Sequence, residues 1–155
     1  MIRVVLTVLV AVALLAAATP ALTDARAATT AERLDSESDR IERAVGEIAA
    51  GSVSVEDPAL AARTTVTVRA PTGFAAAPVD RVALVETENA EGDEVALRYQ
   101  IGGEAARTVS IAPVAAGATV DVDGGAIELR PAGESRLALR LVDDDGPTVR
   151  IARLG

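Results

Sequence analysis

Two short runs of aspartate in the last third of the chain are the residues whose types and spacing could do chemistry. One run is Asp121-Val122-Asp123-Gly124, and the other is Asp143-Asp144-Asp145-Gly146. Two carboxylates alone can carry out glycoside hydrolysis, and carboxylates gathered at a turn can bind a hard cation such as calcium. Neither run continues to the bidentate glutamate of an EF-hand loop, so a plain solvated turn is the simpler interpretation. The residues left as calcium candidates are Asp143, Asp144 and Asp145.

Most other catalytic chemistry is excluded by the residue types that the chain lacks. It contains no cysteine and no histidine, and every basic residue is an arginine. Its serines therefore have no histidine or lysine to take their proton, which argues against hydrolases with an activated serine. Zinc sites mostly need histidine or cysteine, and no glycine-rich loop matches a P-loop or a dinucleotide fingerprint. We expect no catalytic residue and no cofactor, and thus a protein that is not an enzyme.

The charge balance is that of an acidic protein, with 23 acidic residues against 15 basic ones and a net charge of -8. No basic stripe is present to neutralise phosphates, and only Phe74 and Tyr99 could stack on bases, so we expect no nucleic-acid partner. Arginine as the sole basic type, with abundant alanine and valine, resembles the composition of haloarchaeal proteins. High salt screens the repulsion within an acidic surface of that kind.

The first 27 residues predict an export signal or a membrane anchor. Arg3 gives a basic start, and residues 4–18 are apolar apart from Thr7, as in a signal-peptide core. As a helix this run is about 22 Å long, shorter than a hydrocarbon core of about 30 Å. Ala16-Ala17-Ala18 and Ala25-Arg26-Ala27 each offer an A-x-A motif at which a signal peptidase could cut.

The same segment also fits a membrane helix that is retained. Extending the apolar run to Leu22 gives residues 4–22, which can span a bilayer with little tilt. Pro20 would bend such a helix, and membrane helices tolerate a proline where neighbours satisfy the freed carbonyl. The basic start places the N-terminus inside and the body of the protein outside in either case.

Residues 28–51 predict an amphipathic helix with charged outer faces. Thr29 or Thr30 would cap its start and Gly51 would end it. This helix has two interpretations: its apolar stripe packs on the domain that follows, or it forms a seam with helices of other subunits. The first interpretation is the more usual one for such a helix, and the narrowness of the stripe slightly favours a retained N-terminal segment. The residues that form the stripe are Leu34, Ile41, Val45 and Ile48.

A linker at residues 52–63 is expected to precede a β domain at residues 64–155. Within it, Leu137, Leu139 and Leu141 alternate with polar or small residues, so one strand face is buried and the other is wet. Short strands separated by turn signals indicate a sandwich. The predicted fold class is therefore α+β, mostly β, with an N-terminal helix followed by an antiparallel β-sandwich of about eight short strands. The predicted strands are 64–69, 81–87, 94–101, 107–112, 118–122, 126–130, 135–142 and 148–152.

The order of these elements resembles that of type IV pilins and pseudopilins. An apolar helix containing Pro20 runs on into an amphipathic helix at residues 29–50, and a C-terminal β domain follows. The resemblance implies that the helix packs against other subunits in a filament. The whole chain, with its Met-Ile-Arg start, its Ala-Thr-Pro-Ala-Leu segment and its Glu-Arg-Leu-Asp helix, also resembles small haloarchaeal proteins of a domain-of-unknown-function family. That second resemblance implies a link to archaeal type IV pilus or secretion-type genes.

These patterns together predict a non-enzymatic exported surface protein, either anchored in the cell membrane and facing outside or secreted after cleavage. The expected role is a pilin-like or accessory component of an archaeal type IV pilus or secretion-type system. Its partners would be other subunits, bound through the N-terminal helix, and the membrane, bound through residues 4–22. The alternative is a soluble secreted β-sandwich that acts as a binding module.

Overall fold

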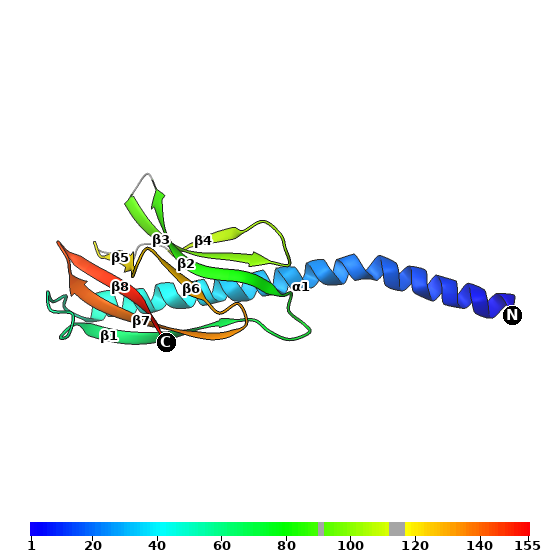
Figure 1. The fold of residues 1–155 in the computed structure, drawn as a ribbon, viewed down its shortest axis with the longest axis horizontal. Coiled ribbons are helices and arrows are strands. Elements are labelled where there is room, and N and C mark those ends of the chain that lie inside the picture. Colours follow the sequence, from blue (N-terminus) through cyan, green and yellow to red (C-terminus); the bar gives the residue numbers. More distant parts are fainter. Residues whose placement is uncertain (90–91, 112–116) are drawn as a thin grey trace.

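The computed structural model describes residues 1–89, 92–111 and 117–155, and Figure 1 shows one long helix followed by a β domain. The helix is α1 (Ile2–Gly51). The predicted fold class is confirmed, because the strands build two sheets that pack as a sandwich. In the described residues the strands are β1 (Ala62–Ala70), β2 (Val79–Asn89), β3 (Gly92–Ile101), β4 (Arg107–Ile111), β5 (Thr119–Val122), β6 (Ala126–Leu129), β7 (Gly133–Asp143) and β8 (Pro147–Leu154).

Helix α1 runs without interruption through the point at which we expected a second helix to begin. Thr29 does not cap a helix start, because its hydroxyl donates to the Ala25 carbonyl one turn back at 2.9 Å. Alanine-rich sequence with high helix propensity surrounds this threonine, so nothing stops the first helix before the second begins. The predicted end is confirmed, since Gly51 is the last helical residue and Ser52 is extended.

The eight strands form one sheet of order β1-β7-β8-β5 and a second of order β4-β3-β2-β6. Antiparallel pairs dominate, as predicted, and β7 pairs on one side with β1 and on the other with β8. The exception is β5, which pairs with β8 in parallel. Because the chain enters this short edge strand from the other sheet, no hairpin turn sets its direction.

The predicted strand ends are mostly within a few residues of the observed ones. Strand β1 begins at Ala62, inside the region expected to be a linker. The rest of that region is also attached to the domain, because Val55 forms an isolated bridge with Val142 and accepts a hydrogen bond from the Asp143 amide at 2.9 Å. Strand β4 ends at Ile111, and residue 112 of the predicted strand lies outside the described residues.

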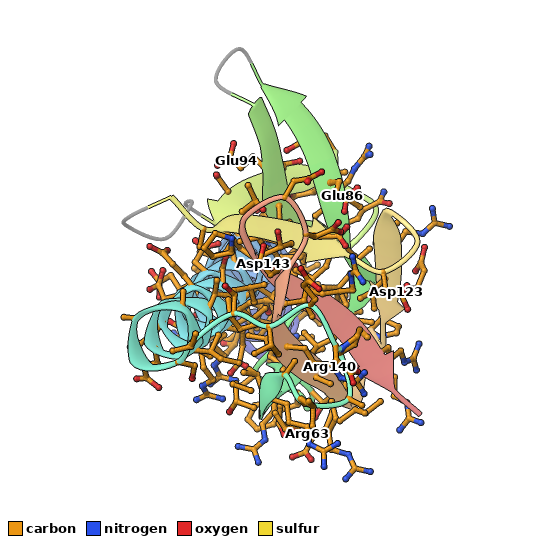
Figure 2. The ribbon with its side chains drawn as sticks, turned by 90° about the vertical axis from the view of Figure 1, so that its left-hand side faces the viewer. Arg63, Glu86, Glu94, Asp123, Arg140 and Asp143 are labelled. Atoms are coloured by element: carbon orange, nitrogen blue, oxygen red, sulfur yellow. The ribbon has the colours of Figure 1, made fainter. Side chains whose placement is uncertain are left out.

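The C-terminal half of α1 closes one open side of the sandwich. It contacts β1, an edge strand of the first sheet, and β4, an edge strand of the second. Figure 2 looks along the helix and shows it beside the two sheets. The residues of α1 that are buried there are Thr30, Ala31, Leu34, Ser38, Ile41, Val45 and Ile48.

Two charged residues of α1 also cover the free edge of β1. Glu37 accepts a hydrogen bond from the Arg69 amide at 3.2 Å, and Arg40 lies 3.5 Å from the Thr67 carbonyl oxygen. The two helix side chains form an ion pair with each other at 3.2 Å. Unpaired strand edges invite other strands to bind, so this cover protects the sandwich from edge-to-edge association.

Thr30 joins the middle of α1 to the loop between β1 and β2. Its side chain is fully buried, and its hydroxyl oxygen accepts a hydrogen bond from the Ala77 amide at 2.9 Å. The same hydroxyl lies 3.4 Å from the Ala77 carbonyl oxygen, to which it donates. A residue expected to cap a helix therefore fixes a loop of the β domain to the helix.

We predict that Thr30→Val destabilises the fold, because valine keeps the shape but leaves the buried Ala77 amide without an acceptor. The expected loss is about 1–3 kcal/mol in the free energy of unfolding, measured by denaturant titration of the full chain in detergent. Thr29→Val is the matched control, since the Thr29 hydroxyl bonds only within its own helix. Equal stability of the two variants would contradict this role for Thr30.

Candidate functional site

The N-terminal half of α1 is the most prominent feature of the surface. Residues 1–25 are all exposed, and Figure 1 shows this half extending well beyond the β domain. An apolar surface of this size is not stable in water, because each buried CH₂ group gains about 0.8 kcal/mol. Its large apolar side chains are Met1, Ile2, Val4, Val5, Leu6, Val8, Leu9, Val10, Val12, Leu14, Leu15 and Leu22.

This half of α1 is long and apolar enough to cross a membrane, and none of its most apolar stretch is buried in the protein. A signal sequence near the N-terminus has the same properties. The structure is thus compatible with either a membrane anchor or a signal peptide, as the sequence predicted.

The threonine hydroxyls of the exposed half are satisfied inside the helix. The hydroxyls of Thr7, Thr19 and Thr23 donate to carbonyls one turn back, at 2.8, 2.8 and 3.1 Å. Pro20 lies inside the helix and has no amide hydrogen to donate to the preceding turn. In hydrocarbon every polar backbone and side-chain group needs such a partner, so the three threonines are compatible with a lipid environment.

The two A-x-A motifs both lie within α1. One lies in the exposed half, and the other lies at the border with the half that packs on the β domain, here called the packed half. Ala16-Ala17-Ala18 lies in the exposed half, and a cut there would leave residues 19–25 exposed. Ala25-Arg26-Ala27 lies where exposure ends, because Ala27 is the first residue to pack against the hydrophobic core. A cut after Ala27 would remove the exposed half and leave the buried residues of α1, which begin at Thr30, in place.

The predicted helix seam lies inside the chain's own core. Leu34, Ile41 and Val45 have no exposed surface, and Ile48 is 6% exposed. All four belong to one hydrophobic cluster with residues of both sheets. The first interpretation of the stripe therefore describes this structure, and these side chains are not available to helices of other subunits.

The aspartates considered for calcium are held by protein groups. Asp143 accepts a hydrogen bond from the Gly146 amide at 3.1 Å, which forms a turn in which Asp145 has a φ of 55°. Asp144 forms an ion pair with Arg150 at 2.9 Å. Within residues 1–89, 92–111 and 117–155, no three acidic side chains gather in a way that could hold a metal ion.

Asp121 from the other aspartate run binds the same arginine, at 2.8 Å. These two carboxylates, brought together from β5 and from the turn before β8, raise the pKa of Arg150, mainly through the hydrogen bond with Asp121. The structure thus turns the two runs into acceptors for one guanidinium. Asp123 is exposed at the β5–β6 turn.

Arg150 belongs to a row of three arginines that the sequence did not reveal. The register places Arg63 of β1 opposite Arg140 of β7, and Arg140 opposite Arg150 of β8. Like charges directly opposite each other on a sheet are destabilising, and Asp121 and Asp144 offset this at one end of the row. Figure 2 shows Arg63 and Arg140 on the same side of the molecule. Only the strand order brings these residues together, so no sequence motif could have found them.

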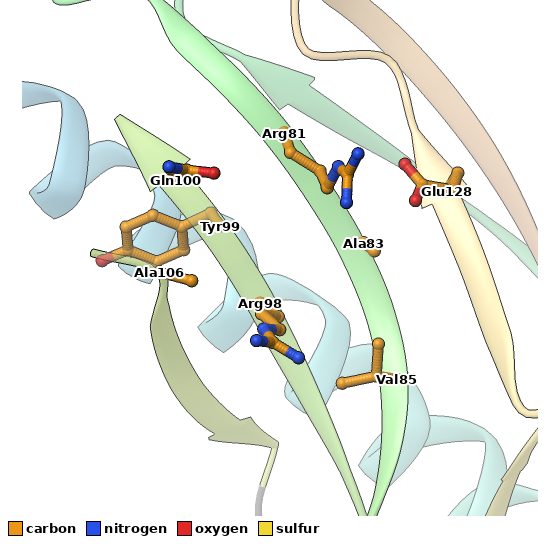
Figure 3. A pocket seen from close by; sticks show the side chains of 8 residues that line it. All are labelled: Arg81, Ala83, Val85, Arg98, Tyr99, Gln100, Ala106 and Glu128. Carbon is orange, nitrogen blue, oxygen red and sulfur yellow. The ribbon is translucent and has the colours of Figure 1, made fainter. Parts of the chain in front are cut away.

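The outer face of the second sheet has a small hollow of about 220 Å³. Figure 3 shows Arg81, Arg98 and Glu128 around the small side chain of Ala83, on three neighbouring strands. The register sets Ala83 opposite both Arg98 and Glu128, so the depression results from one short side chain between long ones. The mixed charge and small size give no indication of a particular ligand.

Tyr99, on β3, connects the second sheet to α1. Its hydroxyl donates to the Asp35 carboxylate at 3.0 Å, and only 2% of the residue is exposed. Burial raises the pKa of Tyr99 to about 12, and the hydrogen bond and the charge of Asp35 add to the rise. Because the pKa is higher in the folded chain than in the unfolded one, the neutral phenol stabilises the fold. This contribution to the free energy of unfolding is complete below about pH 10 and is lost as the pH rises toward 12.

We predict that titration of the tyrosine absorbance gives a pKa near 12 for the intact chain. The spectrum reports Tyr99 alone, because the chain has one tyrosine and no tryptophan. Asp35→Ala is expected to lower this pKa, although burial keeps it above 10. Asp39→Ala, on an exposed position of the same helix, should leave it unchanged. A pKa of 10 in the unaltered chain would contradict the packing of Tyr99 against α1.

Comparison with known proteins gives one match that covers nearly the whole chain. A family model described as "Domain of unknown function (DUF7311)" matches residues 1–154. No curated protein and no solved structure matches the chain.

Proposed function

The chain belongs to the family described as Domain of unknown function (DUF7311), and we propose that it is a non-enzymatic surface protein of a haloarchaeal cell. The apolar half of α1 stays in the cell membrane, through residues 4–22, and the β domain faces outside. The protein acts as a pilin-like or accessory component of a type IV pilus or secretion-type system.

One observation carries this proposal, namely the division of a single helix into two halves with opposite surroundings. Every residue from 1 to 25 is exposed, whereas the half that begins near Ala27 is packed between two sheets. The exposed half needs an apolar environment that the chain itself does not supply. Arg3 and the amino terminus, at the far end, favour an N-terminus inside the cell.

The same division supports a pilin-like layout. The resemblance to pilins and pseudopilins implies that the helix packs against other subunits in a filament. Here the apolar side chains of the packed half are buried in the chain's own core. Contacts between copies would therefore use the exposed half, and the exposed apolar side chains from Ile2 to Leu15 provide that surface. Bacterial pilins carry an acidic residue near the start of their apolar run, whereas the first acidic residue here is Asp24. This departure from the pilin pattern favours an accessory role over that of the main filament subunit.

Single cysteines test both the membrane position and the contacts between copies, because the chain has none of its own. We predict that Val12→Cys, in the exposed half, resists a membrane-impermeant thiol reagent on intact cells until the membrane is dissolved. It should also form disulfide-linked dimers on oxidation if copies pack side by side. Val53→Cys, 81% exposed just after α1, should be labelled at once and stay monomeric.

Equal labelling of the two cysteines on intact cells would contradict a membrane position for the first half of α1. Labelling of Val12→Cys only after the membrane is dissolved, without dimers of this variant, would support the anchor but contradict a filament-like packing of copies. Thiol labelling tests the membrane position and disulfide-linked dimers test the contacts between copies, so either part of the proposal can fail without the other.

The second candidate function is a soluble secreted β-sandwich that binds a ligand or another surface protein. The position of Ala25-Arg26-Ala27 favours it, because a cut after Ala27 leaves every fully buried residue of α1, from Thr30 to Ile48, in place. In that case the protein would accumulate in the culture medium. The anchored form instead predicts that the protein stays with the membrane fraction after a high-salt wash.

A further inference from the structure

The loop between β1 and β2, residues 71–78, is apolar and uncharged in a chain of which 25% is charged. It contains the only phenylalanine, Phe74, whose side chain is 87% exposed. An exposed aromatic side chain offers a large apolar area that a partner molecule or a membrane can cover. Nothing in the fold of the sandwich requires an aromatic residue here.

A tight turn presents Phe74 at the tip of this loop. The Ala76 amide donates to the Gly73 carbonyl at 3.2 Å, and Gly73 has a φ of 100°, which favours glycine. The buried pair of hydrogen bonds between Ala77 and Thr30 fixes the other end of the turn to α1. The phenylalanine is therefore held in a defined place relative to the helix.

That place is the end of the β domain nearest the exposed half of α1. Figure 1 shows the loop that follows β1 extending along the helix in the direction of the N-terminus. Leu22, the end of the apolar run, lies eight residues before Thr30, or about 12 Å along the helix. The Gly73–Ala76 turn keeps the Phe74 backbone closer to Ala77 than the distance of about 10 Å that three extended residues would span. The loop that carries Phe74 thus extends from the level of Thr30 toward the end of the apolar run.

We propose that the 71–78 loop is a second membrane contact, in which Phe74 inserts into the interfacial layer of the lipid beside α1. Aromatic side chains are favoured at that depth, where a ring contacts acyl chains while the nearby backbone stays hydrated. This inference rests on the proposed function, since the loop meets a bilayer only when the apolar half of α1 remains in it. Two points of attachment fix the orientation of the β domain, which a single helix would leave free to tilt.

The absence of tryptophan allows a direct test with the full chain. Phe74→Trp places one fluorophore at the tip of the loop, and Val53→Trp places one at an equally exposed site past the other end of the packed helix. Each variant is reconstituted into vesicles of phosphatidylcholine and phosphatidylglycerol, with and without bromine on the acyl chains. Flotation of the vesicles reports whether the chain itself is bound.

The proposal predicts that Phe74→Trp emits at shorter wavelength than Val53→Trp and loses intensity in the brominated vesicles, whereas Val53→Trp does not. Vesicles that float with the protein but leave both tryptophans equally unquenched would overturn the loop contact and leave the anchor standing. A chain that does not float with the vesicles would overturn the anchor and the loop contact together.

Discussion

Burial of one face of α1 between the edges of two sheets is the interaction on which the rest of the structure depends. A two-sheet sandwich has open sides where its inner faces would meet water, and on one side α1 fills that gap with Leu34, Ile41, Val45 and Ile48. Removing a buried side chain of this size costs about 2–5 kcal/mol. Because the helix is rigid and continuous, fixing its C-terminal half also determines where its exposed half points.

The sequence predicted most of the architecture because alternation along strands and helical spacing both reflect burial directly. Leu137, Leu139 and Leu141 are almost completely buried, as the alternation indicated. The stripe on the helix was identified residue by residue, and of its two possible partners the structure shows the chain's own β domain. Small residues such as Ala31 and Ser38 complete the buried face, so the interface is wider than the large apolar residues alone suggested.

What could not be predicted depends on the order and register of strands that are far apart in the sequence. The arginine row of Arg63, Arg140 and Arg150 exists only because β7 lies between β1 and β8. The ion pair of Asp121 with Arg150 depends on the parallel register of β5 and β8, and Asp144 binds the same arginine from the β7–β8 turn. Thr30 looked like a helix cap because the loop that it binds lies 47 residues later.

The candidate membrane segment is the part of the site that local sequence predicted best. Its length and apolarity need no knowledge of the fold, and the structure adds that the body of the protein leaves it uncovered. The structure also relates this segment to the β domain, since about one turn of helix separates the end of exposure from Thr30. The domain is thus expected to lie close to the membrane surface.

The first residue of the protein in the native membrane tests the central claim most directly. N-terminal sequencing of the chain from washed membranes should begin at Met1 or Ile2, with the apolar half of α1 still attached. A chain that begins at Ala28, after Ala25-Arg26-Ala27, would contradict the anchor. It would leave only the packed half of the helix, and the mature protein would be a soluble β-sandwich.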